Sequence, residues 1–323
     1  MKNDMIFGFM LMLSDHMWED ELSPSKGWHL PPNYRPEISV EVDAWDKTVA
    51  FLAERKYNLV LIDVGDGIKY ESHPEISAPN AWDKDFLRKK LNEMRALGLE
   101  PIPKLNFSTA HDTWLKGYRR LISTPEYYRV AADLIREVCE VFGYPRLFHL
   151  GFDEETAVAQ DQAGWEITIV RQGDLWWHDL FFLAGECEKH GARPWIWSDY
   201  LVNHRDVFLE KMPKSILQMN YFYREIVNVP ESDWRYKWIE AYRTLEKHGF
   251  DQVGCPSTWD TNHCALSNLG FFKNELTSEH FKGVVTAPWE ATTNRMLYSL
   301  YNDAHQLYLA RREYYPETLL DKE

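Results

Sequence analysis

The stretch RLFHLGFDE, residues 146–154, joins a short apolar run to two adjacent carboxylates. Residues 147–150 have the length and composition of a buried strand. Asp153 and Glu154 stand where that strand would meet a loop, a place where Gly or Asn is the more common turn residue. Because a carboxylate is costly to bury without partners, the pair predicts either a solvated acidic loop or a functional site, and the rest of the chain has to decide between them.

The unit of short apolar strand and amphipathic helix recurs on both sides of this stretch. Apolar residues spaced three and four apart, as in Ala131, Leu134, Ile135 and Val138, predict helices. Several helices end on a Gly such as Gly98, a common helix C-cap. The predicted strands are residues 5–13, 59–64, 100–105, 147–151, 193–198, 216–221, 252–256 and 283–287, and the predicted helices are 42–55, 84–97, 125–142, 173–190, 204–212, 232–248, 264–279 and 294–312.

Strands that alternate with helices indicate a parallel sheet, and eight such units favour a closed barrel over an open sheet. The absence of Gly-x-Gly-x-x-Gly after the first strand argues against a dinucleotide-binding fold. No Ser- or Pro-rich linker separates two domains. The sequence therefore predicts an α/β protein with a single (β/α)8 barrel domain over residues 1–323.

The composition narrows the range of partners. The chain has 323 residues, 50 acidic and 36 basic side chains and a net charge of -14, with its Lys and Arg scattered over helix-like segments, so we expect no nucleic acid partner. No apolar segment approaches 18 residues and the first residues lack a secretion signal, which predicts a soluble, cytoplasmic chain with no membrane partner, although an export signal could have been removed. The four cysteines form no Cys-x-x-Cys pair and are expected to be buried thiols.

Every predicted strand ends in a charged or amide side chain beside an aromatic one. Barrel enzymes carry their chemistry on these loops, and Trp and Tyr rings stack on the apolar faces of sugars. The chain is rich in both, with 14 Trp and 17 Tyr. The candidate substrate-binding residues gathered in this way are Asp66, Asn106, His111, His149, Trp197, Asp199, Tyr221, Tyr223, Trp259, Trp289 and Glu290, and the loop after the first strand adds Asp15, His16, Trp18, Trp28 and His29.

Residues 149–154 resemble the His-x-Gly-Gly-Asp-Glu signature of the family 20 β-N-acetylhexosaminidases, with Phe152 in place of the second Gly. Other segments that resemble the family follow in the same order along nearly the whole barrel, although only the strand-four motif is specific. These are 58–66 for its Asn…Asp stretch, 73–75 for Tyr-Pro-Glu, 102–111 for Pro-Glu-x-Asp-x-Pro-Gly-His with Lys104 and Asn106 replacing the acids, 197–199 for Trp-x-Asp, and Trp289-Glu290 for the final Trp-x-Glu.

The resemblance implies a retaining, exo-acting β-N-acetylhexosaminidase that removes terminal GalNAc or GlcNAc from a small molecule or oligosaccharide. In that family the substrate's own 2-acetamido oxygen attacks the anomeric carbon, so no protein nucleophile, metal or cofactor is needed. Asp153 would then orient the acetamido group and stabilise the oxazolinium, and Glu154 would act as general acid and base. Tyr221 or Tyr223 would donate to the acetamido carbonyl.

The sequence also departs from the family's pattern. The family usually has an Arg after the first strand, where this chain has residues 15–18 without one, and the family's extra amino-terminal domain is missing. The missing Arg tilts the expected preference toward GalNAc or a broader pocket. Strand alternation sends His149 and Asp153 to one side and Glu154 to the other, so we predict a bend at the strand end that brings Glu154 into the cleft.

Three other functions fit parts of the pattern. Carboxylates and imidazoles at strand ends bind divalent ions, which would make the chain a metal-dependent hydrolase or isomerase that uses His16, Asp63, His111, Asp153 and Asp199. A barrel that only binds sugars is the second, but it would have no reason to keep an acid beside a like charge. The third is a glycosidase in which Glu290 is a protein nucleophile beside Glu154.

Overall fold

Eight parallel strands form the centre of the molecule in the computed structural model, which describes residues 5–18, 35–162 and 169–320. Each strand pairs with the next, and β8 pairs with β1, so the sheet closes in sequence order. The predicted (β/α)8 barrel is confirmed. The strands are β1 (Ile6–Met12), β2 (Leu59–Asp63), β3 (Glu100–Lys104), β4 (Leu147–His149), β5 (Arg193–Trp197), β6 (Leu217–Tyr221), β7 (Gln252–Cys255) and β8 (Phe281–Thr286).

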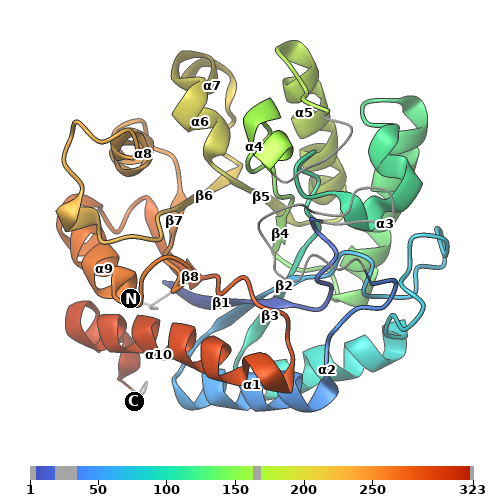
Figure 1. The fold of residues 1–323 in the computed structure, drawn as a ribbon, viewed down its shortest axis with the longest axis horizontal. Coiled ribbons are helices and arrows are strands. Elements are labelled where there is room, and N and C mark those ends of the chain that lie inside the picture. The colour runs from blue at the N-terminus through green and yellow to red at the C-terminus, as the bar shows by residue number, and fades with distance from the viewer. Residues whose placement is uncertain (1–4, 19–34, 163–168, 321–323) are drawn as a thin grey trace.

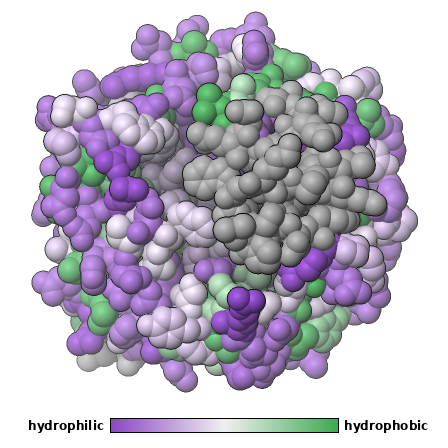
Figure 2. Space-filling view, viewed as in Figure 1, coloured by the Kyte–Doolittle hydropathy of each residue, from purple (hydrophilic) through white to green (hydrophobic). Residues whose placement is uncertain are grey.

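Helices surround the barrel as an outer ring (Figure 1). The long ones lie close to their predicted positions: α1 (Val42–Glu54), α2 (Lys84–Ala96), α3 (Pro125–Val141), α5 (Asp174–Lys189), α7 (Arg205–Lys211), α8 (Tyr236–Lys247), α9 (Cys264–Glu275) and α10 (Leu297–Tyr314). On the face that Figure 2 shows, the described residues are mostly hydrophilic, with apolar residues scattered among them. None of the helices in the described ranges combines the length and apolar character that crossing a bilayer requires.

Some predicted helix ends were wrong, and several short helices were missed. Helix α8 begins at Tyr236 because a turn closes before it, in which Asp233 accepts from the Arg235 amide at 2.9 Å. The missed helices are too short to show a helical period. They are η1 (Thr113–Arg120), α4 (Ala157–Gln162), α6 (Asp199–Asn203), η2 (Ile226–Asn228) and η4 (Pro316–Leu319), whereas η3 (Asn294–Met296) lies within the helix predicted over 294–312.

Two apolar layers hold the fold together, one inside the barrel and one between strands and helices. On β5 the rings of Trp195 and Trp197 fill the barrel interior, whereas Ile196 packs in the outer layer. Successive side chains of a β-strand point to opposite faces in this way. Asp199 does not extend the pattern, because β5 ends at Trp197 and Asp199 begins α6. The four cysteines are all buried.

The chain turns sharply after β4, which ends at His149 rather than at Gly151 as predicted. Backbone φ is positive at Gly151 (79°), Phe152 (70°) and Glu154 (54°). This left-handed conformation costs a side-chain-bearing residue about 1 kcal/mol. At Gly151 no side chain fits at all, since a Cβ would overlap the Asn106 side chain. The predicted bend at the strand end is confirmed.

Candidate active site

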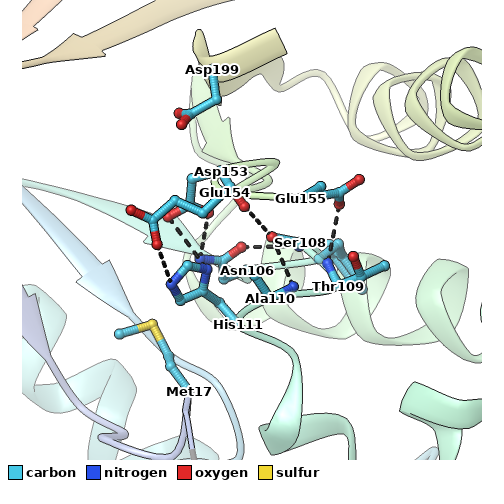
Figure 3. Close-up of polar contacts among 12 residues, drawn as sticks. Met17, Asn106, Ser108, Thr109, Ala110, His111, Asp153, Glu154, Glu155 and Asp199 are labelled. Carbon is cyan, nitrogen blue, oxygen red and sulfur yellow. Dashed lines mark hydrogen bonds and ion pairs between the residues drawn. The ribbon is translucent and has the colours of Figure 1, made fainter. Parts of the chain in front are cut away.

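The loops after β3 and β4 place three ionisable side chains together (Figure 3). His111 lies between the two acids of the β4 motif, with Nδ1 3.6 Å from Asp153 Oδ2 and Nε2 3.5 Å from Glu154 Oε2. One imidazole therefore faces both carboxylates through its two ring nitrogens. The bend after β4 makes this possible, because Asp153 and Glu154 would otherwise point to opposite sides of the strand.

Asp153 is buried and held from two directions. Its Oδ1 accepts a hydrogen bond from the Asn106 side-chain amide at 3.0 Å, and its backbone carbonyl accepts one from the Ser108 hydroxyl. Asn106 in turn accepts from the Ser108 amide at 3.0 Å, so the loop after β3 is ordered around the Asp153 side chain. Ser108 was not predicted as a site residue, because a single Ser in a loop carries no sequence signal.

Glu154 has a different environment from its neighbour. Half of its side-chain surface is exposed. Burial of the carboxyl group in this cleft, with a further contribution from the Asp153 carboxylate, raises the pKa of Glu154, while His111 opposes the shift. A carboxyl group with a raised pKa holds its proton at higher pH and can act as a general acid.

The barrel interior below the acids contains an ion pair. Lys104 donates to Asp63, both side chains are fully buried, and the Lys104 Nζ also lies 3.6 Å from the Met17 sulfur. Beside them, His149 accepts from the Gly151 amide at 3.0 Å. Burial, and then the charge of Lys104, lower the pKa of His149 well below its ordinary value, so this imidazole is neutral. His149 therefore supports the turn after β4.

An aromatic wall, formed by Trp18, Trp197, Tyr221, Tyr223 and Trp289, lines one side of the same space. Trp197 lies between Tyr221 and Trp289, with ring centroids 5.7 Å and 5.9 Å away. Tyr221 stacks on Tyr223, which accepts a hydrogen bond from the Trp289 indole at 3.0 Å. Trp18 contacts both Trp289 and His111. The wall thus reaches His111, which faces both acids.

Two more predicted acids lie at strand ends around the cleft. Asp199 accepts from the Tyr221 hydroxyl at 2.9 Å. Burial, followed by the charges of Asp153 and Glu154, raises the pKa of Asp199 well above its ordinary value. Glu290 accepts from the Ser299 hydroxyl at 3.2 Å, and partial burial raises its pKa. The predicted Trp259 lies on the loop after β7 with 47% of its surface exposed.

Asp66 is fully buried in a network that belongs to the loop after β1. It accepts from the Ser14 hydroxyl at 2.6 Å, bonds to the His16 ring at 2.8 Å and accepts from Lys116 at 2.5 Å. Burial alone would raise the pKa of Asp66, but the bonds to His16 and Lys116 outweigh it and lower the pKa. Since Thr113 also binds the His16 carbonyl at 2.9 Å, this network fixes the loop that presents Met17 and Trp18.

The structure thus brings Asn106, His111, Asp153 and Glu154 into direct contact and places the predicted aromatic residues, except Trp259, in the adjoining wall. Trp28 and His29 lie outside the described residues. In the described part of the chain, no three or more His, Cys, Asp or Glu side chains are grouped so that they could hold a metal ion.

Solved structures with the same architecture are known. The barrel matches those of family 20 β-N-acetylhexosaminidases. The Vibrio harveyi exo-β-N-acetylglucosaminidase, solved with N-acetylglucosamine, is 15% identical with a TM-score of 0.61, and the match covers 97% of this chain and 57% of that one. The Flavobacterium johnsoniae chitobiase is 16% identical with a TM-score of 0.63, and the match covers 97% of this chain and 50% of that one. Dispersin B is 13% identical with a TM-score of 0.59, and the match covers 96% of this chain and 99% of that one.

These likenesses establish the fold. The chain spans about half the length of the Vibrio and Flavobacterium proteins. No protein-family model matches the chain, and no curated protein sequence matches it significantly. The chemistry must therefore be argued from the side chains themselves.

Proposed function

We propose that the chain is a retaining, exo-acting β-N-acetylhexosaminidase that uses substrate-assisted catalysis. The observation that carries the proposal is the placement of His111 between Asp153 and Glu154, one acid buried and fixed, the other exposed to the cleft with a raised pKa. Two adjacent acids in such different environments are suited to different roles. The fold shared with solved β-N-acetylhexosaminidases supports this reading.

The roles follow from the two environments. Asp153 accepts from Asn106 and is oriented by it, so its other oxygen is suited to accept the acetamido N–H and to stabilise the positive charge of the oxazolinium. Glu154, whose raised pKa favours the protonated form, donates its proton to the glycosidic oxygen. The resulting carboxylate then removes a proton from the water that opens the oxazolinium. His111 holds both acids in position.

The aromatic wall is suited to the N-acetyl group and the sugar face. The Tyr221 hydroxyl donates to Asp199. The Tyr223 hydroxyl accepts from Trp289 and has the Cys255 thiol, a weak acceptor, beside it, so its proton is held less firmly than that of Tyr221. Of the two tyrosines we therefore assign Tyr223 as the donor to the acetamido carbonyl, with Trp197 and Trp289 against the methyl group. Asp199 and Glu290 are assigned to sugar hydroxyls, and Asp66 to the support of the Trp18 loop.

The test compares nitrophenyl β-GalNAc, β-GlcNAc and β-glucoside as substrates for the wild-type protein, Asp153→Asn and Glu154→Gln. We expect hydrolysis of at least one N-acetyl sugar, with retention of configuration, and little hydrolysis of the glucoside. Equal rates on the glucoside would contradict acetamido participation and would favour Glu290 as a protein nucleophile. Loss of activity on chelation, restored by a divalent cation, would favour the metal-dependent alternative, and binding without turnover would favour a binding barrel.

A further inference from the structure

Arg171 is a buried residue that connects the two loops of the candidate site. It follows α4 and precedes α5, and only 4% of its surface is exposed. Its guanidinium donates to both carboxylate oxygens of Glu155, to the Phe107 carbonyl at 2.8 Å and to Asp179 at 3.2 Å. A planar guanidinium can make these bonds in several directions at once, which a lysine cannot do.

The partners of Arg171 belong to the segments that carry the proposed chemistry. Phe107 follows Asn106 in the loop after β3, and Glu155 follows Glu154 in the loop after β4. Glu155 also accepts from the Thr109 amide at 3.1 Å, which ties the two loops a second time. The distance between His111 on one loop and the two acids on the other therefore depends on this bridge.

The bridge also supports the strained turn. Phe152 has a φ of 70°, and the Arg171 guanidinium carbon lies 4.6 Å from the centre of its ring. On another side the ring meets Trp176 edge-on at 5.4 Å. A left-handed aromatic residue persists only where its surroundings hold it. The family signature has Gly at this position, which adopts such a φ without strain, so this chain needs a support that the signature does not include.

Arg171 is itself anchored on the outer side. Asp179 on α5 accepts from the Ser123 hydroxyl at 2.7 Å and from the Tyr128 hydroxyl at 2.5 Å, which connects it to α3. Two residues before Arg171, Ile169 is bracketed by the Gln160 side chain, which accepts from its amide at 2.8 Å and donates to its carbonyl at 2.6 Å. The guanidinium is thus fixed to the helix ring before it reaches the loops.

We propose that Arg171 is a positioning residue that, together with Glu155, sets the placement of His111 relative to Asp153 and Glu154. The inference rests on the proposed function for its activity assay, but its structural part can be measured without it. Misplacement of a catalytic group by about 1 Å can cost about 100-fold in rate, so the effect of loosening this bridge is large enough to detect.

The main test variant is Arg171→Lys, which keeps a cation beside Glu155 and Asp179 but cannot also span to the Phe107 carbonyl. We expect kcat to fall about 30-fold to 100-fold with KM nearly unchanged. We also expect the alkaline limb of the kcat profile to move about half a pH unit to higher pH, because His111, which lowers the pKa of Glu154 more than Asp153 raises it, would no longer be held beside it. A merely structural role would move neither the limb nor kcat of the folded enzyme.

Arg311→Lys is the matched control. Arg311 is also buried, lies 4.0 Å from the centre of the Phe7 ring, and donates to the Lys56 carbonyl at 2.7 Å and the Thr318 carbonyl at 2.7 Å. These partners lie at the amino-terminal end of the barrel, because Phe7 is the second residue of β1 and Lys56 precedes β2. The control should lower Tm to a similar extent and leave kcat and the pH profile unchanged.

Hydrogen exchange of peptides covering residues 106–111 and 151–156 provides a readout without substrate. Exchange should rise at least about 10-fold in Arg171→Lys and stay at the wild-type level in Arg311→Lys. If Arg171→Lys does not fold, Glu155→Gln replaces it in the test, and we again expect kcat to fall and hydrogen exchange to rise. The proposal would be overturned if the variant that folds had the same kcat, pH profile and hydrogen exchange as the wild type. A wild-type protein inactive on all N-acetylhexosaminides would reject the proposed function, while the exchange result would still decide the bridge.

Discussion

Asp66 after β2 and Glu154 after β4 are acids at the same end of one barrel, and their surroundings treat them in opposite ways. Asp66 is fully buried with bonds to Ser14, His16 and Lys116, and its pKa is lowered. Glu154 is half exposed, its Oε2 lies 3.5 Å from the His111 Nε2, and its pKa is raised. A carboxylate that accepts several hydrogen bonds has a lowered pKa and fixes a loop. One with few donors has a raised pKa and can act as an acid.

The largest expected effect is on the Glu154 side of this comparison. Glu154→Gln should lower kcat/KM for a nitrophenyl N-acetylhexosaminide about 10³-fold, because the amide cannot protonate the leaving group. The loss should shrink for a dinitrophenyl leaving group, which needs less protonation, and the midpoint of urea unfolding should hardly change. A variant that kept its rate on poor leaving groups would remove Glu154 as the acid.

Asp66→Asn should affect stability instead. Removing the charge from a buried carboxylate that binds His16 and Lys116 is expected to lower the free energy of unfolding by about 3 kcal/mol. Urea denaturation at pH 7, followed by tryptophan fluorescence, measures this. The loss should diminish at low pH, because the lowered pKa of Asp66 means that its stabilising effect is present above the unfolded-state pKa and lost as pH falls through the folded-state pKa. Equal stability at pH 7 would mean that the network is dispensable.

Asp153→Asn tests how the two acids of the β4 motif depend on each other. We expect kcat/KM to fall about 100-fold from the loss of oxazolinium stabilisation. The residual activity should show its alkaline limb at lower pH than the wild type. The sign follows because the Asp153 charge raises the pKa of Glu154, and a neutral Asn removes that contribution. A pH–rate profile of both proteins checks it, and a limb that moved to higher pH would contradict the assigned roles.

The smallest effect is expected at the exposed rim. Trp259→Ala, on the loop after β7, should raise KM about threefold to tenfold for chitooligosaccharides and leave nitrophenyl substrates nearly unaffected, since a stacked ring contributes roughly 1 kcal/mol. Steady-state kinetics on both substrate types measure the difference. An equal change in KM on both substrate types would place Trp259 against the terminal sugar and not against the following sugars of the oligosaccharide.

Much of the fold could be predicted because its signals are local and repeated. Strands such as Leu59–Asp63 are recognisable by their apolar composition, and helices such as Pro125–Val141 by the spacing of their apolar residues. The bend after β4 could be predicted because strand alternation alone would point Glu154 away from the cleft that Asp153 faces. The bounds of α8 were missed because a side-chain turn at Asp233 sets them, a contact that a periodic pattern does not contain.

The supporting residues of the site were harder to anticipate. Arg171 lies 16 residues from Glu155 in sequence and acts through a bridge that exists only once α5 is docked. Asp66 was predicted to bind sugar because it ends a strand, but its partners Ser14, His16 and Lys116 come from two other loops. Residue type shows which side chains can do chemistry, and only their three-dimensional neighbours show which ones are already engaged.

The overlap that a Cβ at Gly151 would make with Asn106 limits how this site can evolve. Any substitution at that position would push apart the loop that carries His111 and the turn that carries both acids. We therefore expect only Gly to be tolerated there. The next position, Phe152, differs from the Gly of the signature that it resembles, and a Gly there would adopt the same φ of 70° without strain. Two adjacent positions in one turn therefore differ in the substitutions that they tolerate. Position 151 has space only for Gly, whereas position 152 can hold a larger residue as long as its neighbours support the left-handed backbone.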